Sequence, residues 1–152
     1  MYRKILLAYN GSVEGRAVLA QGADLAGLCG AAVCLLAVID MPSAFAGSEI
    51  VSADMATDNR RQVEETVREG IRNLRARSLE VEGRVAYGEP VAQIAAVAAE
   101  IGADLVVVGH RKRGALARWW AGGTSVSRNL LSRIGCSVLV AVENPANGTS
   151  AS

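Results

Sequence analysis

The clearest strand in this sequence is Leu105-Val106-Val107-Val108, and Gly109 closes it. The run has no polar alternation, which is typical of a strand covered on both faces in a parallel sheet. A basic segment, Arg111-Lys112-Arg113, follows, and the small-residue cluster Gly122-Gly123-Thr124-Ser125 comes before another helical stretch. Together these features predict an α/β fold in which the segment after this strand binds an anion.

Four further apolar runs extend over Ile5 to Ala8, Val33 to Ile39, Val81 to Val85 and Ser137 to Val142. Between the runs, apolar residues recur every three or four positions, as on one face of a helix. These positions are Val18, Gly22, Leu25 and Cys29; Val63, Val67, Ile71 and Leu74; and Val91, Ile94, Ala95, Ala98 and Ile101. Such alternation predicts a doubly wound, five-stranded parallel sheet with helices on both faces.

The edges of this sheet can also be predicted. Glu82 and Arg84 interrupt the apolar residues of the run that begins at Val81, so this strand is expected to be half solvated and to lie at an edge. The last run is apolar on both faces and would need a cover at an edge. A second copy of the strand across a two-fold axis would provide it, which predicts a homodimer through Val138, Leu139 and Val140.

The composition indicates one small domain. With 152 residues, 51% of them apolar, the chain can bury a single core, expected over residues 1–143, and residues 144–152 are expected to form a flexible polar tail. The net charge of +1 comes from interspersed acids and bases, which argues against nucleic acid as a partner.

The first apolar run is too short for a signal sequence or a membrane span, so a cytoplasmic protein without membrane contact is expected. Cys29, Cys34 and Cys136 are odd in number and lie in apolar segments, and their spacing to the one histidine, His110, does not suit a metal site. They are therefore expected to be reduced core thiols.

The segment after Gly109 carries the main functional prediction. Glycines let backbone N–H groups approach a phosphate, hydroxyls donate further hydrogen bonds, and a helix that begins near Thr124 or Ser125 would direct its positive end at the same point. Val126, Leu130 and Ile134 fit one face of that helix. A strand that simply ends in a solvated basic loop would show the same residues.

In a doubly wound sheet, ligands bind beyond the carboxyl ends of the strands, where the strand order reverses. Here that point is expected between the first and fourth strands, which would place Ala8, Tyr9 and Asn10 opposite Gly109. Val38, at the end of the second strand, could flank a base or be an ordinary core residue.

The chain resembles the universal stress protein family over nearly its whole length. The resemblance is carried by three segments in order: Ile5-Leu6-Leu7-Ala8-Tyr9-Asn10-Gly11-Ser12, Gly102-Ala103-Asp104-Leu105-Val106-Val107-Val108-Gly109-His110 and Cys136-Ser137-Val138-Leu139-Val140. It implies a five-stranded parallel sheet of order 3-2-1-4-5 and a homodimer paired through the last strands. One branch of the family binds ATP, and the other does not.

The ATP-binding branch carries a glycine, two residues, a second glycine, nine residues, and then glycine followed by serine or threonine. Gly109 fits the first position, but Lys112 stands at the second glycine. Counting forward puts Gly122-Gly123 at the final pair, whereas counting backward from Cys136 puts Thr124-Ser125 there.

Where the family usually has an aspartate after the first strand, this chain has Asn10. An amide can still bond a ribose hydroxyl or a base edge, but it is a poorer magnesium ligand, so any Mg²⁺ would be held through the phosphates and water. His110 is expected to be structural or to lie near a phosphate. The predicted nucleotide contacts are Ala8, Tyr9, Asn10, Val38, Gly109, His110, Arg111, Lys112, Gly122, Gly123, Thr124, Ser125 and Val126.

Three functions fit these residues. The first is a nucleotide-binding stress or signalling module, a homodimer that binds ATP and presents a surface to an unidentified protein partner. The second is a dimeric interaction protein with the same fold that no longer holds ATP. The third, an adenylating or slowly ATP-hydrolysing enzyme, ranks last because the sequence contains neither a Walker-type loop nor a Ser-Gly-Gly-x-Asp-Ser pyrophosphatase loop.

Overall fold

A computed structural model describes residues 1–9, 13–39, 53–109 and 132–142 of the chain. The five strands are β1 (Lys4–Ala8), β2 (Ala32–Ile39), β3 (Val81–Tyr87), β4 (Leu105–Gly109) and β5 (Ser137–Ala141). The three helices in the described part are α1 (Val13–Cys29), α2 (Ala53–Arg75) and α3 (Pro90–Ile101). Most of the last predicted helix and the whole tail 144–152 lie outside the described residues.

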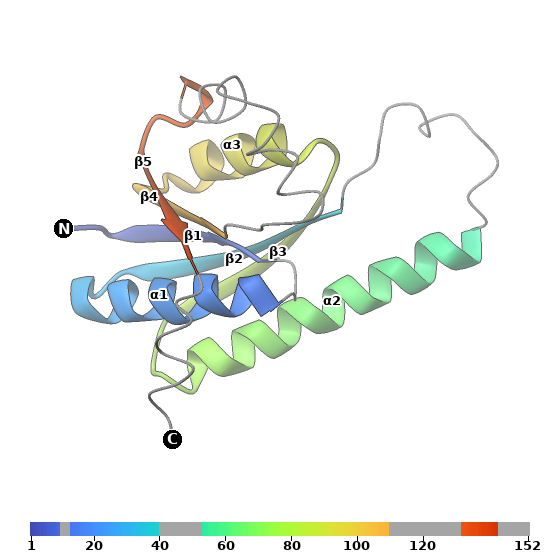
Figure 1. Ribbon diagram of the computed structural model, residues 1–152, viewed down its shortest axis with the longest axis horizontal. Coiled ribbons are helices and arrows are strands. Elements are labelled where there is room, and N and C mark those ends of the chain that lie inside the picture. The colour runs from blue at the N-terminus through green and yellow to red at the C-terminus, as the bar shows by residue number, and fades with distance from the viewer. Residues whose placement is uncertain (10–12, 40–52, 110–131, 143–152) are drawn as a thin grey trace.

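The strands form one parallel sheet of order β3-β2-β1-β4-β5 (Figure 1). Leu7 of β1 aligns with Leu35 of β2 on one side and with Val107 of β4 on the other. The doubly wound sheet and its strand order are thus as predicted. The order also confirms that β3, with the exposed Glu82, and β5 form the two edges of the described sheet.

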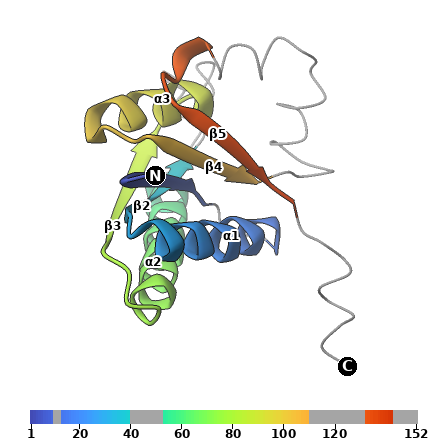
Figure 2. The same ribbon diagram turned by 90° about the vertical axis from the view of Figure 1, so that its left-hand side faces the viewer.

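Helices cover both faces of the sheet, as Figures 1 and 2 show, with α1 and α2 on one side and α3 on the other. Alternate strand residues divide between two buried clusters. Leu7, Leu35 and Val107 pack on the α1 and α2 side, and Leu6, Leu36 and Val106 on the α3 side. Because both faces are buried, the central strands are apolar throughout, which is the pattern seen in the sequence.

Helix α3 is bounded as its sequence predicts. Pro90 occupies the first turn, where its missing N–H costs nothing, and the left-handed Gly102 (φ 67°) ends the helix by donating its N–H to Ala98 and Ala99 carbonyls. Strand β3 differs from the prediction, since it continues past Val85 to Tyr87. The pairing persists because Val38 and Ile39 of β2 still align with Ala86 and Tyr87.

Of the three cysteines, which are all free thiols, only Cys34 is fully buried. Cys29 and Cys136 are half-buried, so the prediction of three core thiols is wrong for these two. They lie at the end of α1 and just before β5, where each packs against a buried cluster but stays partly exposed. Burial, with a smaller effect of Glu82, raises the pKa of Cys34 to about 11, so this thiol stays protonated at neutral pH. Within the described residues, no helix has the length and apolar character needed to cross a bilayer.

The helix layer below the sheet lies close to it because glycines face the strands. A Cβ at Gly22 of α1 would lie 2.3 Å from Cδ2 of the fully buried Leu7. A Cβ at Gly70 of α2 would lie 2.5 Å from Cδ2 of Leu35. In contrast, a Cβ at Gly27 of α1 would meet nothing within 4 Å.

This contrast generates a test within one helix. Gly22→Ala should destabilise the fold by about 1–3 kcal/mol, because the added Cβ would overlap Leu7 and force this fully buried side chain to shift. Gly27→Ala, the matched control, should leave stability unchanged or raise it by up to about 1 kcal/mol through helix propensity. Urea denaturation measures both, and equal effects at the two sites would contradict the packing described here.

The register of β1 and β4 is fixed at their amino ends by Asp104. Its carboxylate accepts the N–H of Arg3 (2.8 Å) and of Lys4 (3.1 Å), and its own N–H donates to the Lys4 carbonyl (3.0 Å). Desolvation raises the pKa of Asp104, but these N–H donors outweigh it, so the pKa lies below its ordinary value of 3.8. The charged carboxylate therefore holds the two central strands together.

A lowered pKa in the folded state gives stability that is present above about pH 4 and is lost as the pH falls through the folded-state pKa. We expect Asp104→Asn to cost about 1 kcal/mol at pH 7, from the weakened bonds to the two N–H groups. The difference from the unmodified protein should shrink below pH 4. Urea titrations between pH 2 and 7 measure it, with Asp24→Asn, at an exposed ion pair, as the control. A gap that persists at pH 2 would show that the charge of Asp104 is not the cause.

Candidate functional site

The strand order reverses between β1 and β4. From β1 the chain proceeds through α1 to β2 and then β3 on one side, and α3 then carries it back to β4 on the other side of β1. In folds with such a reversal, ligands bind beyond the carboxyl ends of the two strands that flank it. Gly109, the last residue of β4, is buried at this point. The predicted location of the switch point is confirmed.

Small apolar side chains line the sheet near this end, on the α3 side. Ala8 of β1 and Val38 of β2, both predicted site residues, are half-buried and pack against the same cluster. Ala86 of β3 and Val140 of β5 do so as well. These four side chains, here called the apolar floor, come from strands on both sides of the switch point.

Tyr9 is placed differently from Ala8, although the two are adjacent. Its N–H extends the β1–β2 pairing by donating to the Leu36 carbonyl at 2.8 Å. Its side chain packs on the α1 and α2 side, where a Cβ on Gly70 would lie 3.4 Å from the ring. Burial raises the pKa of the Tyr9 hydroxyl, Glu69 adds to this rise, and Arg16 opposes it. At the carboxyl end of β1, the Tyr9 side chain therefore lies on the opposite face of the sheet from Ala8, and only its backbone remains beside Ala8.

The remaining predicted contacts lie outside the described residues. They are Asn10, His110, Arg111, Lys112, Gly122, Gly123, Thr124, Ser125 and Val126. Of the predicted set, the structure thus brings together Ala8, Val38 and Gly109 and turns the Tyr9 side chain to the other face. Among the residues that are described, no group of three His, Cys, Asp or Glu side chains gathers to hold a metal ion.

Helix α3 begins at this same end of the sheet, but a side chain of the protein already binds the free N–H groups of its first turn. The Glu89 carboxylate accepts the N–H groups of Val91 (3.2 Å) and Ala92 (2.8 Å). Arg133 lies 3.9 Å from the same carboxylate, on the short helical piece that leads to β5. A helix end that holds its own carboxylate is closed to a phosphate.

Sequence reasoning missed Ala86, Val140 and Glu89. Ala86 was missed because the predicted strand ended at Val85, the last residue of the apolar and polar alternation in β3. The turn residues Gly88 and Pro90 could have shown that the strand continues to Tyr87. Glu89 was missed because glutamate is not among the preferred N-cap residues. Its position directly before a first-turn proline is a signal that could have identified it.

Comparisons with known proteins agree with this architecture. The model of the universal stress protein family matches residues 1–141. No curated protein matches the chain by sequence.

Several solved structures share the fold. A universal stress protein in complex with cAMP has 20% identity and a TM-score of 0.68, with 93% of this chain and 97% of that chain covered. A universal stress protein from Archaeoglobus fulgidus in complex with dAMP has 21% identity and a TM-score of 0.64, with coverage of 92% and 98%. The universal stress protein UspA from Lactobacillus plantarum has 18% identity and a TM-score of 0.73, with coverage of 92% and 97%.

The cap of α3 can be tested by mutation. Glu89→Ala should destabilise the fold by about 1 kcal/mol, because two N–H groups of the first turn lose their acceptor. Glu89→Asp keeps a carboxylate at a position that favours aspartate and should be close to neutral. Thermal and urea denaturation measure both variants. Equal losses for the two would mean that Glu89 acts through its ion pair with Arg133 rather than as a cap.

Proposed function

The chain belongs to the universal stress protein family, and from this premise we propose that it is a nucleotide-binding regulatory module that holds an adenine nucleotide, ATP by preference, at the carboxyl ends of β1 and β4. The observation that carries the proposal is the apolar floor beside Gly109 at the point where the strand order reverses. That adenine nucleotides occupy two structural neighbours, as cAMP and dAMP, supports the same ligand class.

The base and ribose would lie against the apolar floor. Ala8, Val38 and Ala86 have short side chains and are half-buried, so a flat ring can approach the sheet between α3 and the strand ends. Dispersion and apolar burial would hold the base, and polar groups at the end of β1 would orient it. Asn10, the next residue but one after Ala8, is our candidate for the bond to a ribose hydroxyl or a base edge.

The phosphates would be bound by the segment that follows β4. Gly109 starts this segment, and the backbone of Gly122, Gly123 and Val126 with the hydroxyls of Thr124 and Ser125 would donate the hydrogen bonds. Arg111 and Lys112 would supply positive charge, and His110 would lie near a phosphate. Mg²⁺, where present, would be held by the phosphates and water.

A homodimer through β5 completes the proposal. The two edges of the described sheet differ, because β3 carries Glu82 and Arg84, whereas Ser137–Ala141 contains no charged residue. Charged edges resist pairing, and uncharged ones permit it. A two-fold axis would set two β5 strands antiparallel, with Val138, Leu139 and Val140 at the interface. Such a dimer, acting in the cytoplasm in a stress response, could present a surface to a protein partner that depends on the nucleotide.

Lys112 favours a second candidate function, a dimeric interaction protein of the same fold without ATP. A lysine at the position of the second glycine can donate to a phosphate, but it can also fill the space that the phosphates need. Slow hydrolysis of ATP ranks below both functions.

Calorimetric titration of ATP and Mg²⁺ into protein freed of nucleotide tests the choice. We expect saturable binding of about one ATP per subunit. Gly123→Asp should weaken it at least about 100-fold, because a carboxylate would face the phosphates. Gly135→Asp introduces the same side chain at an exposed glycine, where a Cβ meets nothing within 4 Å, and should bind ATP within about twofold of the unmodified protein.

Chromatography of the nucleotide released by denaturing freshly purified protein gives an independent readout. An absence of both released nucleotide and binding heat would favour the ATP-free function. Equal affinity in the two aspartate variants would rule out the phosphate position. Sedimentation of the same samples tests the dimer, which both variants should retain, and a monomer would contradict pairing through β5.

A further inference from the structure

Arg133 is an exposed basic residue on the α3 side of the sheet. The residue after it, Ile134, is buried in the cluster between α3 and the sheet, whereas 55% of the Arg133 side chain is open to solvent. Arg133 comes shortly before β5 in the chain, yet its guanidinium lies 3.9 Å from the Glu89 carboxylate at the start of α3. The side chain therefore points toward the carboxyl end of the sheet, where the apolar floor lies.

The contact between Arg133 and Glu89 is loose. The two oxygens of the Glu89 carboxylate already accept the N–H groups of Val91 and Ala92. At 3.9 Å, the Arg133 nitrogen is beyond hydrogen-bonding distance from Oε2 of Glu89. Within the part of the chain that is described, the Arg133 guanidinium donates no hydrogen bond. Charge alone holds it at an exposed position, so an anion that accepts its N–H groups can attract it away from Glu89.

The other described cations that lie on this side of the sheet are already paired, and they lie toward its amino end. Lys4, the first residue of β1, is 3.3 Å from the Glu82 carboxylate. Arg84 of β3 is 3.0 Å from the carboxylate of Glu100, which lies in the last turn of α3. Among the described residues, Arg133 is thus the cation that reaches the carboxyl end of the sheet on the α3 side.

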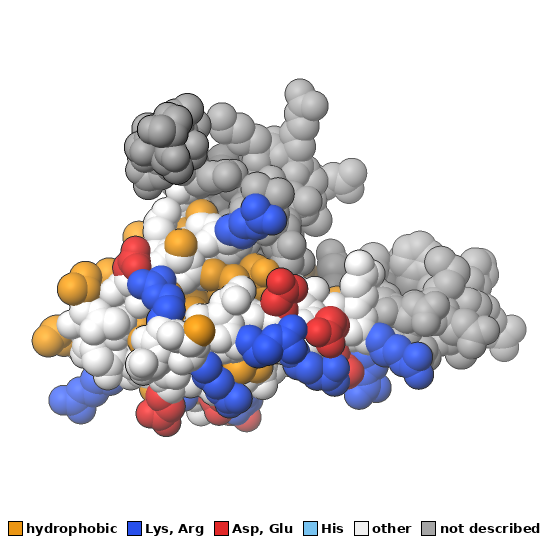
Figure 3. Space-filling model, turned by 90° about the horizontal axis from the view of Figure 1, so that it is seen from below, with side chains coloured by type: hydrophobic (Ala, Val, Ile, Leu, Met, Phe, Trp, Pro, Cys, Tyr) orange, Lys and Arg blue, Asp and Glu red, His pale blue; other side chains and the backbone are white. Residues whose placement is uncertain are grey.

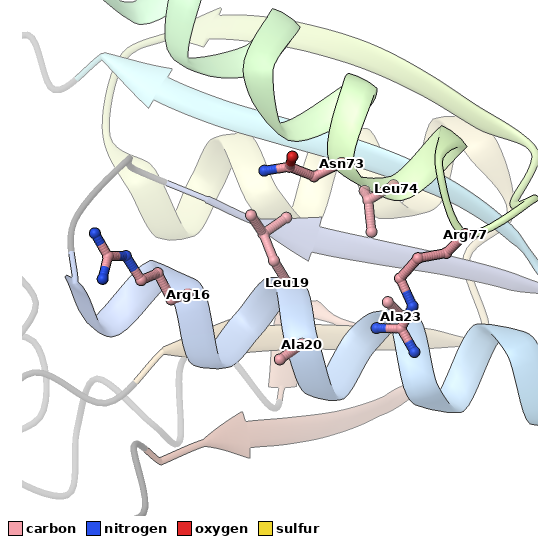
Figure 4. A pocket seen from close by; sticks show the side chains of 7 residues that line it. All are labelled: Arg16, Leu19, Ala20, Ala23, Asn73, Leu74 and Arg77. Atoms are coloured by element: carbon pink, nitrogen blue, oxygen red, sulfur yellow. The ribbon is translucent and has the colours of Figure 1, made fainter. Parts of the chain in front are cut away.

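The arginines of the α1 and α2 layer lie on the opposite face. A groove of about 230 Å³ runs between these two helices, and Arg16 and Arg77 contribute to its lining (Figure 4). Arg77 pairs with Asp24 of α1, and Figure 3 shows basic and acidic side chains interspersed over this face. The buried lining residues Ala23 and Leu74 belong to the cluster on the α1 and α2 side, so the sheet separates the groove from the apolar floor.

We propose that Arg133 is a phosphate-binding residue of the nucleotide site, which Glu89 holds while the site is empty and which the phosphate of a bound nucleotide draws away. This inference rests on the proposed function, because it requires an adenine nucleotide on the apolar floor. Glu89 follows Ala86 of the floor by three residues, a span of at most about 11 Å, so the guanidinium lies close to that ligand.

The chemistry of the two groups favours this exchange. The planar guanidinium of an arginine can donate two parallel N–H bonds to a phosphate, whereas the Glu89 carboxylate is already bonded to the backbone of α3. The cap of α3 is kept when Arg133 leaves, because its hydrogen bonds come from Val91 and Ala92 alone. Glu89 therefore competes with the nucleotide for Arg133, and the two residues should affect nucleotide affinity in opposite directions.

Calorimetric titration of ATP and of adenosine into full-length protein freed of nucleotide tests the proposal. Arg133→Gln should weaken ATP binding about tenfold, the effect of losing a charge-assisted hydrogen bond, and leave adenosine binding within about twofold. Glu89→Gln keeps an oxygen for the cap but removes the charge that competes for Arg133. It should therefore strengthen ATP binding about two- to threefold.

The double variant separates competition from simple repulsion between Glu89 and the phosphate. In the Arg133→Gln background, Glu89→Gln should change ATP affinity by no more than about 1.5-fold, because no Arg133 remains to be released. Arg84→Gln, the same substitution at an arginine paired with Glu100, is the matched control and should bind ATP within about twofold of the unmodified protein.

Three results would overturn this inference and leave the proposed function standing. They are ATP binding that Arg133→Gln leaves unchanged, an equal loss for adenosine, and a gain from Glu89→Gln that persists without Arg133. Weaker ATP binding in both single variants would also overturn it, since the pair would then act through the fold. If the unmodified protein bound no ATP, both proposals would fail.

Discussion

The structure depends on the burial of both faces of its central strands. Side chains of β1, β2 and β4 alternate between two clusters, so neither face can be left to water once the sheet has formed. This requirement places α1 and α2 on one side and α3 on the other, and the chain runs outward from β1 to β3 before it returns to β4 on the other side of β1. The switch point between β1 and β4 thus accompanies the covering of both faces of the sheet.

The same alternation separates two surfaces that start from one strand. Ala8 faces the α3 side and contributes to the apolar floor, whereas the next side chain, Tyr9, passes to the α1 and α2 side and packs beside Gly70. Arg16 of α1 partly opposes the rise that burial causes in the pKa of the Tyr9 hydroxyl. The carboxyl end of β1 therefore borders both the proposed nucleotide site and the layer formed by α1 and α2.

The second constraint is the close packing of α1 and α2 against the sheet. Glycines at positions 22 and 70 let α1 and α2 lie against Leu7 and Leu35, and Gly83 of β3 does the same for Val67 and Ile71 of α2. These contacts hold the two helices close to the sheet, and a groove lined by residues of α1 and α2 remains between the helices. At the other end of the sheet, Asp104 fixes β1 to β4 through backbone bonds, so the two strands that flank the switch point keep their register.

The sequence by itself determined the five strands, the three described helices, the edge position of β3 and the location of the switch point, because apolar periodicity is local and burial depends on it directly. It also placed Ala8, Val38 and Gly109 at or near the carboxyl ends of their strands. Only the tertiary structure decided that Ala86 and Val140 join the apolar floor, that Glu89 closes the end of α3, and that Arg16 and Arg77 border one groove. The apolar floor and the contacts of the two arginines depend on which distant elements pack together, and that packing rests on side-chain fit, which the spacing of apolar residues does not reveal. The Glu89 cap is instead a local contact, with N–H groups two and three residues away, that its position before Pro90 could have indicated.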